Sequence, residues 1–62
     1  MKTSEALRKL NKAGCYLLEH GTNHDWWYSP ITELKFQLPR HQSQELTIGT
    51  KKSIERFSGV KL

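Results

Sequence analysis

Apolar and polar residues alternate most regularly over residues 34–38 of the chain. Leu34, Phe36 and Leu38 fall on one side of an extended backbone and the intervening polar residues fall on the other. This alternation predicts a strand with one buried face. Pro39 has no amide hydrogen with which to continue a ladder, so we expect the strand to end there.

Two further strands are predicted upstream. Residues 15–20 alternate imperfectly, and we assign Tyr16, Leu18 and His20 to one face. Residues 24–29 contain a tryptophan and tyrosine run, which favours a strand. The predicted turns are residues 21–23, which contain glycine and asparagine, and residues 30–33, which begin with proline.

A helix is predicted at each end of the chain. The first spans about residues 3–13, with Thr3 or Ser4 as the N-cap and Gly14 as the residue that ends it. The apolar stripe of this helix is formed by Ala6, Leu7, Leu10 and Ala13.

The second helix is predicted to begin after Thr47 as N-cap and to run to about Ser58, with Gly59 as its stop. Its apolar residues are Ile48, Ile54 and Phe57. Residues 40–46 form the polar connection before it.

The resulting order is α-β-β-β-α, which is an α+β fold in a single domain of residues 1–62. Short turns make the three strands an antiparallel meander. Both helices must bury their apolar stripes, so we expect them to pack on one face of the sheet.

The formal net charge of +4 favours an anionic partner such as nucleic acid, although the same excess could serve solubility alone. Cys15 is the single cysteine, which rules out an internal disulfide and suits a reducing compartment. The first residues are polar, and no apolar run approaches the roughly 20 residues of a membrane span. We therefore expect a soluble, cytoplasmic protein without a signal peptide.

Short motifs along the whole chain resemble the HicA family of toxin ribonucleases. The motifs are Lys12-Ala13-Gly14, Gly21-Thr22-Asn23-His24, Pro39-Arg40-His41, Glu45-Leu46 and Gly49-Thr50-Lys51-Lys52-Ser53-Ile54. The chain departs from the family at Lys51 and near Glu55, where family members often carry apolar residues.

This resemblance implies a fold like a double-stranded-RNA-binding domain and the toxin role of a type II toxin–antitoxin system. It implies a metal-independent endoribonuclease that cleaves mRNA, needs no cofactor and is inhibited by a HicB-like antitoxin. The family's catalytic histidine aligns with His24, which the turn Gly21, Thr22 and Asn23 would position.

Histidine suits such a reaction, because its unperturbed pKa of about 6.5 lets it take a proton near neutral pH. Removing the proton of a ribose 2′-OH allows that oxygen to attack the adjacent phosphorus. Positioned acid–base catalysis of this kind contributes roughly 10²–10⁴-fold. It would leave a cyclic phosphate, and it would require RNA because DNA lacks the hydroxyl.

Arg40 and His41 are candidates to assist this reaction. Arg40 could neutralise the phosphate in the transition state, and His41 could protonate the leaving oxygen, with His20 as the rival acid. The alternative is that these are incidental charges in a polar loop.

RNA contacts are expected from Lys51, Lys52 and Arg56, which could equally form a solvated helix face. Alternation places Trp26 and Tyr28 on the His24 side of the strand and leaves Trp27 on the opposite side. Trp26 could stack on a nucleobase, anchor the antitoxin or pack in the core.

Other functions fit the same residues less well. His20 and His24 have helical metal-ligand spacing, but Gly21 and Asn23 disfavour a helix there and no further ligands complete the set. A non-catalytic RNA-binding module of the same fold is the main alternative to the ribonuclease. A DNA-binding accessory protein is a weaker one.

Overall fold

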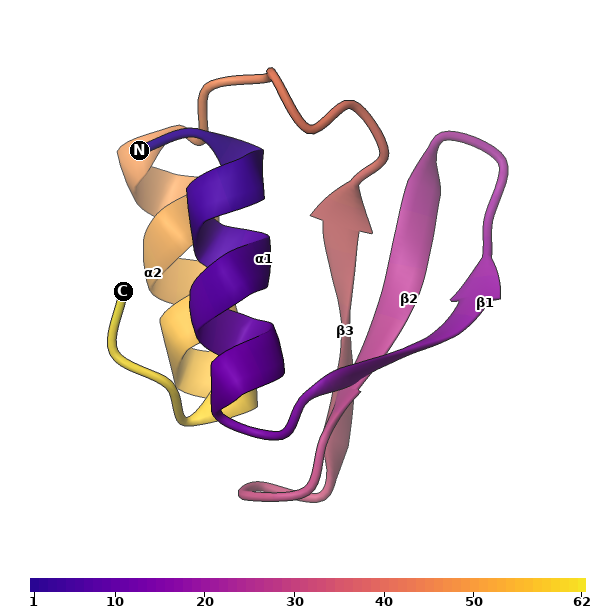
Figure 1. The fold of residues 1–62 in the computed structure, drawn as a ribbon, viewed down its shortest axis with the longest axis vertical. Coiled ribbons are helices and arrows are strands. Elements are labelled where there is room, and N and C mark those ends of the chain that lie inside the picture. The colour runs from indigo at the N-terminus through magenta and orange to yellow at the C-terminus, as the bar shows by residue number, and fades with distance from the viewer.

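The computed structural model describes residues 1–62 and confirms the α-β-β-β-α order (Figure 1). Its elements are α1 (Thr3–Lys12), β1 (Tyr16–His20), β2 (His24–Ser29), β3 (Leu34–Pro39) and α2 (Ile48–Ser58). The strands form one antiparallel sheet in the order β1-β2-β3. Both helices lie on one face of this sheet, as expected, and α2 lies against β3 and β2. Neither helix is long and apolar enough to cross a membrane.

The start of α1 differs from the prediction. The N-cap position is occupied by Lys2, and the amide of Lys2 donates to the Glu5 carboxylate at 3.4 Å. Thr3 is instead the first helical residue and is fully buried, and its hydroxyl donates to the Gln44 carbonyl at 2.8 Å. The hydroxyl is therefore used for a long-range contact with the connection before α2. The end of the helix follows the prediction within one residue, since Gly14 has a φ of 101°.

Strand β1 contains a bulge that sequence alternation did not predict. Tyr16 pairs with Tyr28 and Leu17 with Trp27, but the next pair is Glu19 with Trp26. Because Leu18 is the extra residue, the faces after it are exchanged. The prediction that Tyr16 and His20 share a face is therefore wrong.

The assignment of faces in β2 is confirmed. Trp27 is buried against the helices, so His24, Trp26 and Tyr28 lie on the opposite, outer face. The tyrosine rings of Tyr16 and Tyr28 lie 5.4 Å apart on that outer face.

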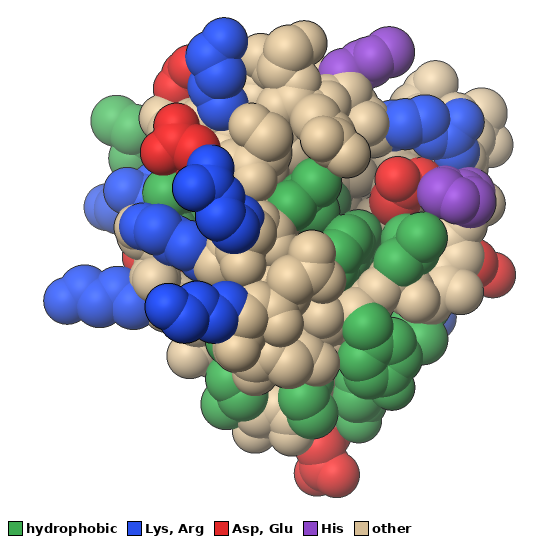
Figure 2. Space-filling view, in the orientation of Figure 1, with side chains coloured by type: hydrophobic (Ala, Val, Ile, Leu, Met, Phe, Trp, Pro, Cys, Tyr) green, Lys and Arg blue, Asp and Glu red, His purple; other side chains and the backbone are tan.

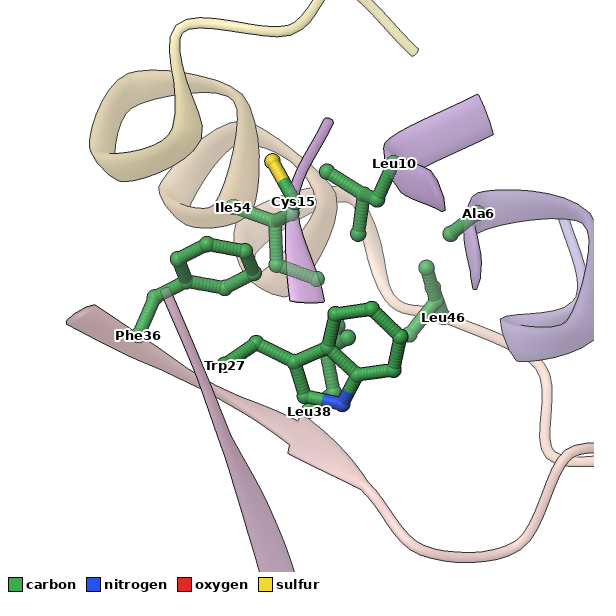
Figure 3. Close-up of a cluster of buried hydrophobic side chains, with 8 residues drawn as sticks. All are labelled: Ala6, Leu10, Cys15, Trp27, Phe36, Leu38, Leu46 and Ile54. Carbon is green, nitrogen blue, oxygen red and sulfur yellow. The ribbon is translucent and has the colours of Figure 1, made fainter. Parts of the chain in front are cut away.

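The core lies between the helices and the inner face of β2 and β3 (Figure 3). Its members are Ala6, Leu10, Cys15, Trp27, Phe36, Leu38, Leu46 and Ile54. Ile54 is the one predicted apolar residue of α2 that is buried, whereas Ile48 is 75% exposed and Phe57 is 38% exposed. Leu46, from the connection that was predicted to be polar, is buried in the core.

The predicted caps of α2 are confirmed. The Thr47 hydroxyl accepts from the Thr50 amide at 3.1 Å, and Gly59 adopts the left-handed conformation at φ 75°. Val60 then packs back against the core. Backbone bonds from Thr3 to Gln44 and from Leu46 to Met1 join the connection before α2 to the first turn of the chain.

Candidate functional site

His24 is the first residue of β2 and directly follows a tight turn. The Gly21 amide donates to the His24 carbonyl at 2.8 Å, and His24 pairs with Pro39 of β3. Its side chain is exposed on the outer face of the sheet and makes no hydrogen bond within the protein. The imidazole is therefore open to a ligand.

Gly21 is required by the close approach of this turn. A Cβ at Gly21 would lie 2.4 Å from the His24 carbonyl oxygen, a contact that a backbone atom can relieve only by moving. Because its φ is not positive, the restriction is one of space and not of backbone conformation. Gly21 thus fixes the backbone that carries His24.

We expect Gly21→Ala to destabilise the protein by about 1–3 kcal/mol, as overpacking usually does. Gly49→Ala is the matched control, since a Cβ there meets nothing within 4 Å and alanine favours the helix. Urea unfolding of the two variants measures the difference. Equal stabilities would show that the turn relaxes freely around the added methyl group.

A groove of about 600 Å³ lies between the sheet and α2, and its lining residues include His24. The sheet contributes His24, Trp26, Lys35, Phe36, Gln37 and Pro39. The connection and α2 contribute Gln44, Glu45, Leu46, Thr47, Gly49, Thr50, Ser53, Ile54 and Phe57. The groove begins beside an exposed imidazole and passes the first turn of α2, where no acidic residue lies.

The predicted RNA-contacting residues are distributed unequally around this groove. Trp26 lines it directly. Lys52 and Arg56 each precede a groove residue of α2, so at about 100° per residue they lie on its solvent rim. Lys51 follows the groove residue Thr50 and lies at a similar angle from the groove, on its other side. Figure 2 shows lysine and arginine side chains gathered over the helices.

Arg40 is bound to neighbouring residues and not directed at His24. It donates from Nε to Asp25 Oδ1 at 3.4 Å, and its terminal amino group donates to the Gly21 carbonyl. Asp25 follows His24 in β2, so its side chain lies on the opposite face of the sheet. In this arrangement Arg40 holds the turn that carries His24.

The two other histidines do not lie in the groove. His41 is exposed in the connection, and its side chain makes no hydrogen bond. His20 pairs with Asp25 across the strands, and the Nδ1 atom of His20 lies 2.9 Å from the Oδ1 atom of Asp25. It therefore shares the inner face with Asp25, opposite to His24, and no three His, Cys, Asp or Glu side chains converge into a metal-binding group.

The carboxylate of Asp25 is stabilised in its charged form. The hydrogen bond from His20, followed by the interactions with Arg40, lowers the pKa of Asp25 below its ordinary 3.8. A carboxyl group with a depressed folded-state pKa stabilises the protein above its unfolded-state pKa. That contribution is lost as the pH falls below about 4 and through the folded-state pKa.

We therefore expect Asp25→Asn to be less stable than the wild type at pH 6, and we expect the difference to shrink as the pH falls below about 4. Urea midpoints of both proteins at several pH values measure it. A constant difference from neutral to acid pH would show that the charge of Asp25 does not contribute.

Several groove residues were not identified by sequence reasoning. Lys35, Gln37 and Gln44 line the groove. The alternation over residues 34–38 placed Lys35 and Gln37 on the polar side of the strand but did not indicate a site there. Pairing of Gln37 with Trp26 brings the strand residues beside the expected site. Gln44 has no local signal, because it reaches the groove through the fold of the connection.

Comparisons with protein-family models, with curated proteins and with solved structures found no match for this chain.

Proposed function

We propose that this protein is the toxin of a type II toxin–antitoxin system, a metal-independent endoribonuclease that cleaves mRNA with His24 and is inhibited by a HicB-like antitoxin. The motifs that resemble the HicA family suggest this function. The observation that supports it most is an unpaired, exposed His24 at a groove bordered by cationic and aromatic side chains. Its site of action would be the cytoplasm, where mRNA is present.

In the proposed reaction, His24 accepts the proton of a ribose 2′-OH. The 2′ oxygen forms a bond to the adjacent phosphorus, and the bond from phosphorus to the 5′ oxygen of the next nucleotide breaks. The departing oxygen takes up a proton from water or from an acid of the protein. The products are a 2′,3′-cyclic phosphate and a free 5′-OH.

Charge on the phosphate increases during this reaction, and a cation in the groove would stabilise it. Lys35 meets this need better than Arg40, because Lys35 lines the groove and Arg40 is engaged with Asp25 and Gly21. We assign Arg40 a positioning role for the His24 turn. His41 remains the proposed acid, since its side chain is free to approach a substrate from the connection.

Incubation with mRNA in EDTA tests the proposal. We expect cleavage to fragments with cyclic-phosphate and 5′-OH ends, and we expect a substrate with 2′-deoxyribose at the cleavage site to stay intact. Addition of a co-purified antitoxin should stop the reaction. Intact RNA after prolonged incubation with folded protein would contradict the nuclease.

A non-catalytic RNA-binding module is the second candidate. It is favoured by the absence of any hydrogen bond that would orient the His24 imidazole. RNA that is retained by the protein but recovered at full length would support this function over the first.

A further inference from the structure

We infer that the groove holds a single-stranded RNA segment, an inference that rests on the proposed function. One unpaired base of this segment lies beside Trp26 and is read by the side-chain amide of Gln37. This assigns the site a substrate class and a specificity-determining residue. The base would be adenine, for the reasons of hydrogen bonding given below.

The dimensions of the groove favour a single strand. Its volume of about 600 Å³ lies within the range of small-ligand pockets, about 300–1,000 Å³. The whole molecule measures only 25 × 23 × 19 Å. A nucleic-acid duplex could cover the surface of so small a protein but could not enter the groove, whereas an unstacked nucleotide could.

Two aromatic rings in the groove are each accompanied by a cation. Lys35 Nζ lies 5.0 Å from the centre of the Trp26 ring on the sheet side, and the Arg56 guanidinium lies 5.2 Å from the centre of the Phe57 ring on the α2 side. Aromatic faces that stack on bases, next to cations that bind the backbone, are typical of single-strand binding. A base that stacks on Trp26 would displace Lys35 toward its phosphate.

Gln37 provides the group that reads the base. It is exposed, lies directly opposite Trp26 in the pairing of β2 and β3, and its side-chain amide has no partner within the protein. A glutamine amide places a donor and an acceptor side by side, and on the Hoogsteen edge of a base only adenine presents the matching pair, N7 and the N6 amino group. Gln44 also has a free amide, on the opposite side of the groove, where it can hold the base or its sugar.

The position of Trp26 connects base reading to cleavage. Trp26 and His24 are two residues apart on the same face of β2, a separation of about 7 Å along the strand. A base held at Trp26 would therefore leave a ribose of the same or the next nucleotide beside the imidazole. The inference predicts that cleavage occurs at a fixed distance from the base that is read.

Binding tests this without dependence on cleavage. The His24→Gln variant is titrated separately into three labelled RNAs. They are a pentamer with a central adenosine among uridines, an all-uridine pentamer and a duplex. We expect the single strand with adenosine to bind most tightly. We expect Gln37→Leu to reduce its preference over uridine about 5- to 160-fold, the value of one lost bidentate contact.

Gln42→Leu is the matched control, because Gln42 is an exposed glutamine in the connection before α2 and lies outside the groove. It should retain the preference. An unchanged preference in Gln37→Leu, an equal loss in Gln42→Leu, or tighter binding of the duplex would each overturn the inference. Cleavage of mRNA by the wild type is scored separately, so base reading can fail while the nuclease stands, and the reverse.

Discussion

Replacing His24 by glutamine is expected to lower the rate of RNA cleavage about 10²–10⁴-fold, the usual contribution of a positioned general base. Glutamine keeps a polar side chain of similar size but cannot take the proton of the 2′-OH at neutral pH. The His24 side chain is exposed and has no partner within the protein, so its replacement should leave the fold unchanged. Single-turnover cleavage at saturating enzyme measures the chemical step, and RNA affinity of the variant is measured alongside.

The pH profile separates the roles of the histidines. An imidazole accepts a proton only when it is neutral, so wild-type cleavage should fall as the solution is acidified well below about pH 6. If His41 acts as the acid, His41→Gln should remove the alkaline limb of the profile and keep the acid limb. His20→Gln should change neither limb, because His20 lies on the opposite face with Asp25. Cleavage by His24→Gln at the wild-type rate would reject His24 as the base.

Local sequence signals were sufficient for the caps of α2 and for the division of β2 into two faces. Thr47 and Gly59 act on the backbone next to them, so the bounds of α2 could be predicted from these residues alone. Alternation within one strand placed Trp27 opposite His24, Trp26 and Tyr28, but burial of Trp27 in the core was established only by the structure. Caps and strand alternation depend only on residues that are close together in the chain, so they can be predicted from the sequence.

Features that depend on register were not predictable. Nothing in residues 15–20 marks Leu18 as the bulged residue, yet it decides that His20 faces Asp25. The contact of Arg40 with Asp25 joins residues 15 positions apart, and no local signal in the sequence predicts it. Burial of Leu46 instead of Ile48 was missed for a similar reason, because the path of the connection is set by its bonds to Met1 and Thr3.

Leu38→Ala is expected to have the largest effect on stability. Leu38 is fully buried in the core cluster, and truncation of a buried leucine costs about 2–5 kcal/mol through lost burial and the cavity that remains. A chain of 62 residues has a net stability of roughly 3–9 kcal/mol. The substitution should therefore remove a large part of the stability, and the urea midpoint should fall steeply or disappear.

Strand β3 supplies its own control for this experiment. Leu34 occupies the same strand and the same side of the alternation but is 46% exposed, so Leu34→Ala should cost less than about 1 kcal/mol. If Leu38→Ala does not fold, Leu38→Val, which removes one methylene group, should give an intermediate and measurable loss of about 1 kcal/mol. Similar losses at positions 34 and 38 would mean that strand propensity, and not burial beneath the helices, determines the contribution of leucine in β3. A loss confined to position 38 would place the stability of the molecule in the layer between the helices and the sheet, which leaves the outer face with His24 free to serve a ligand.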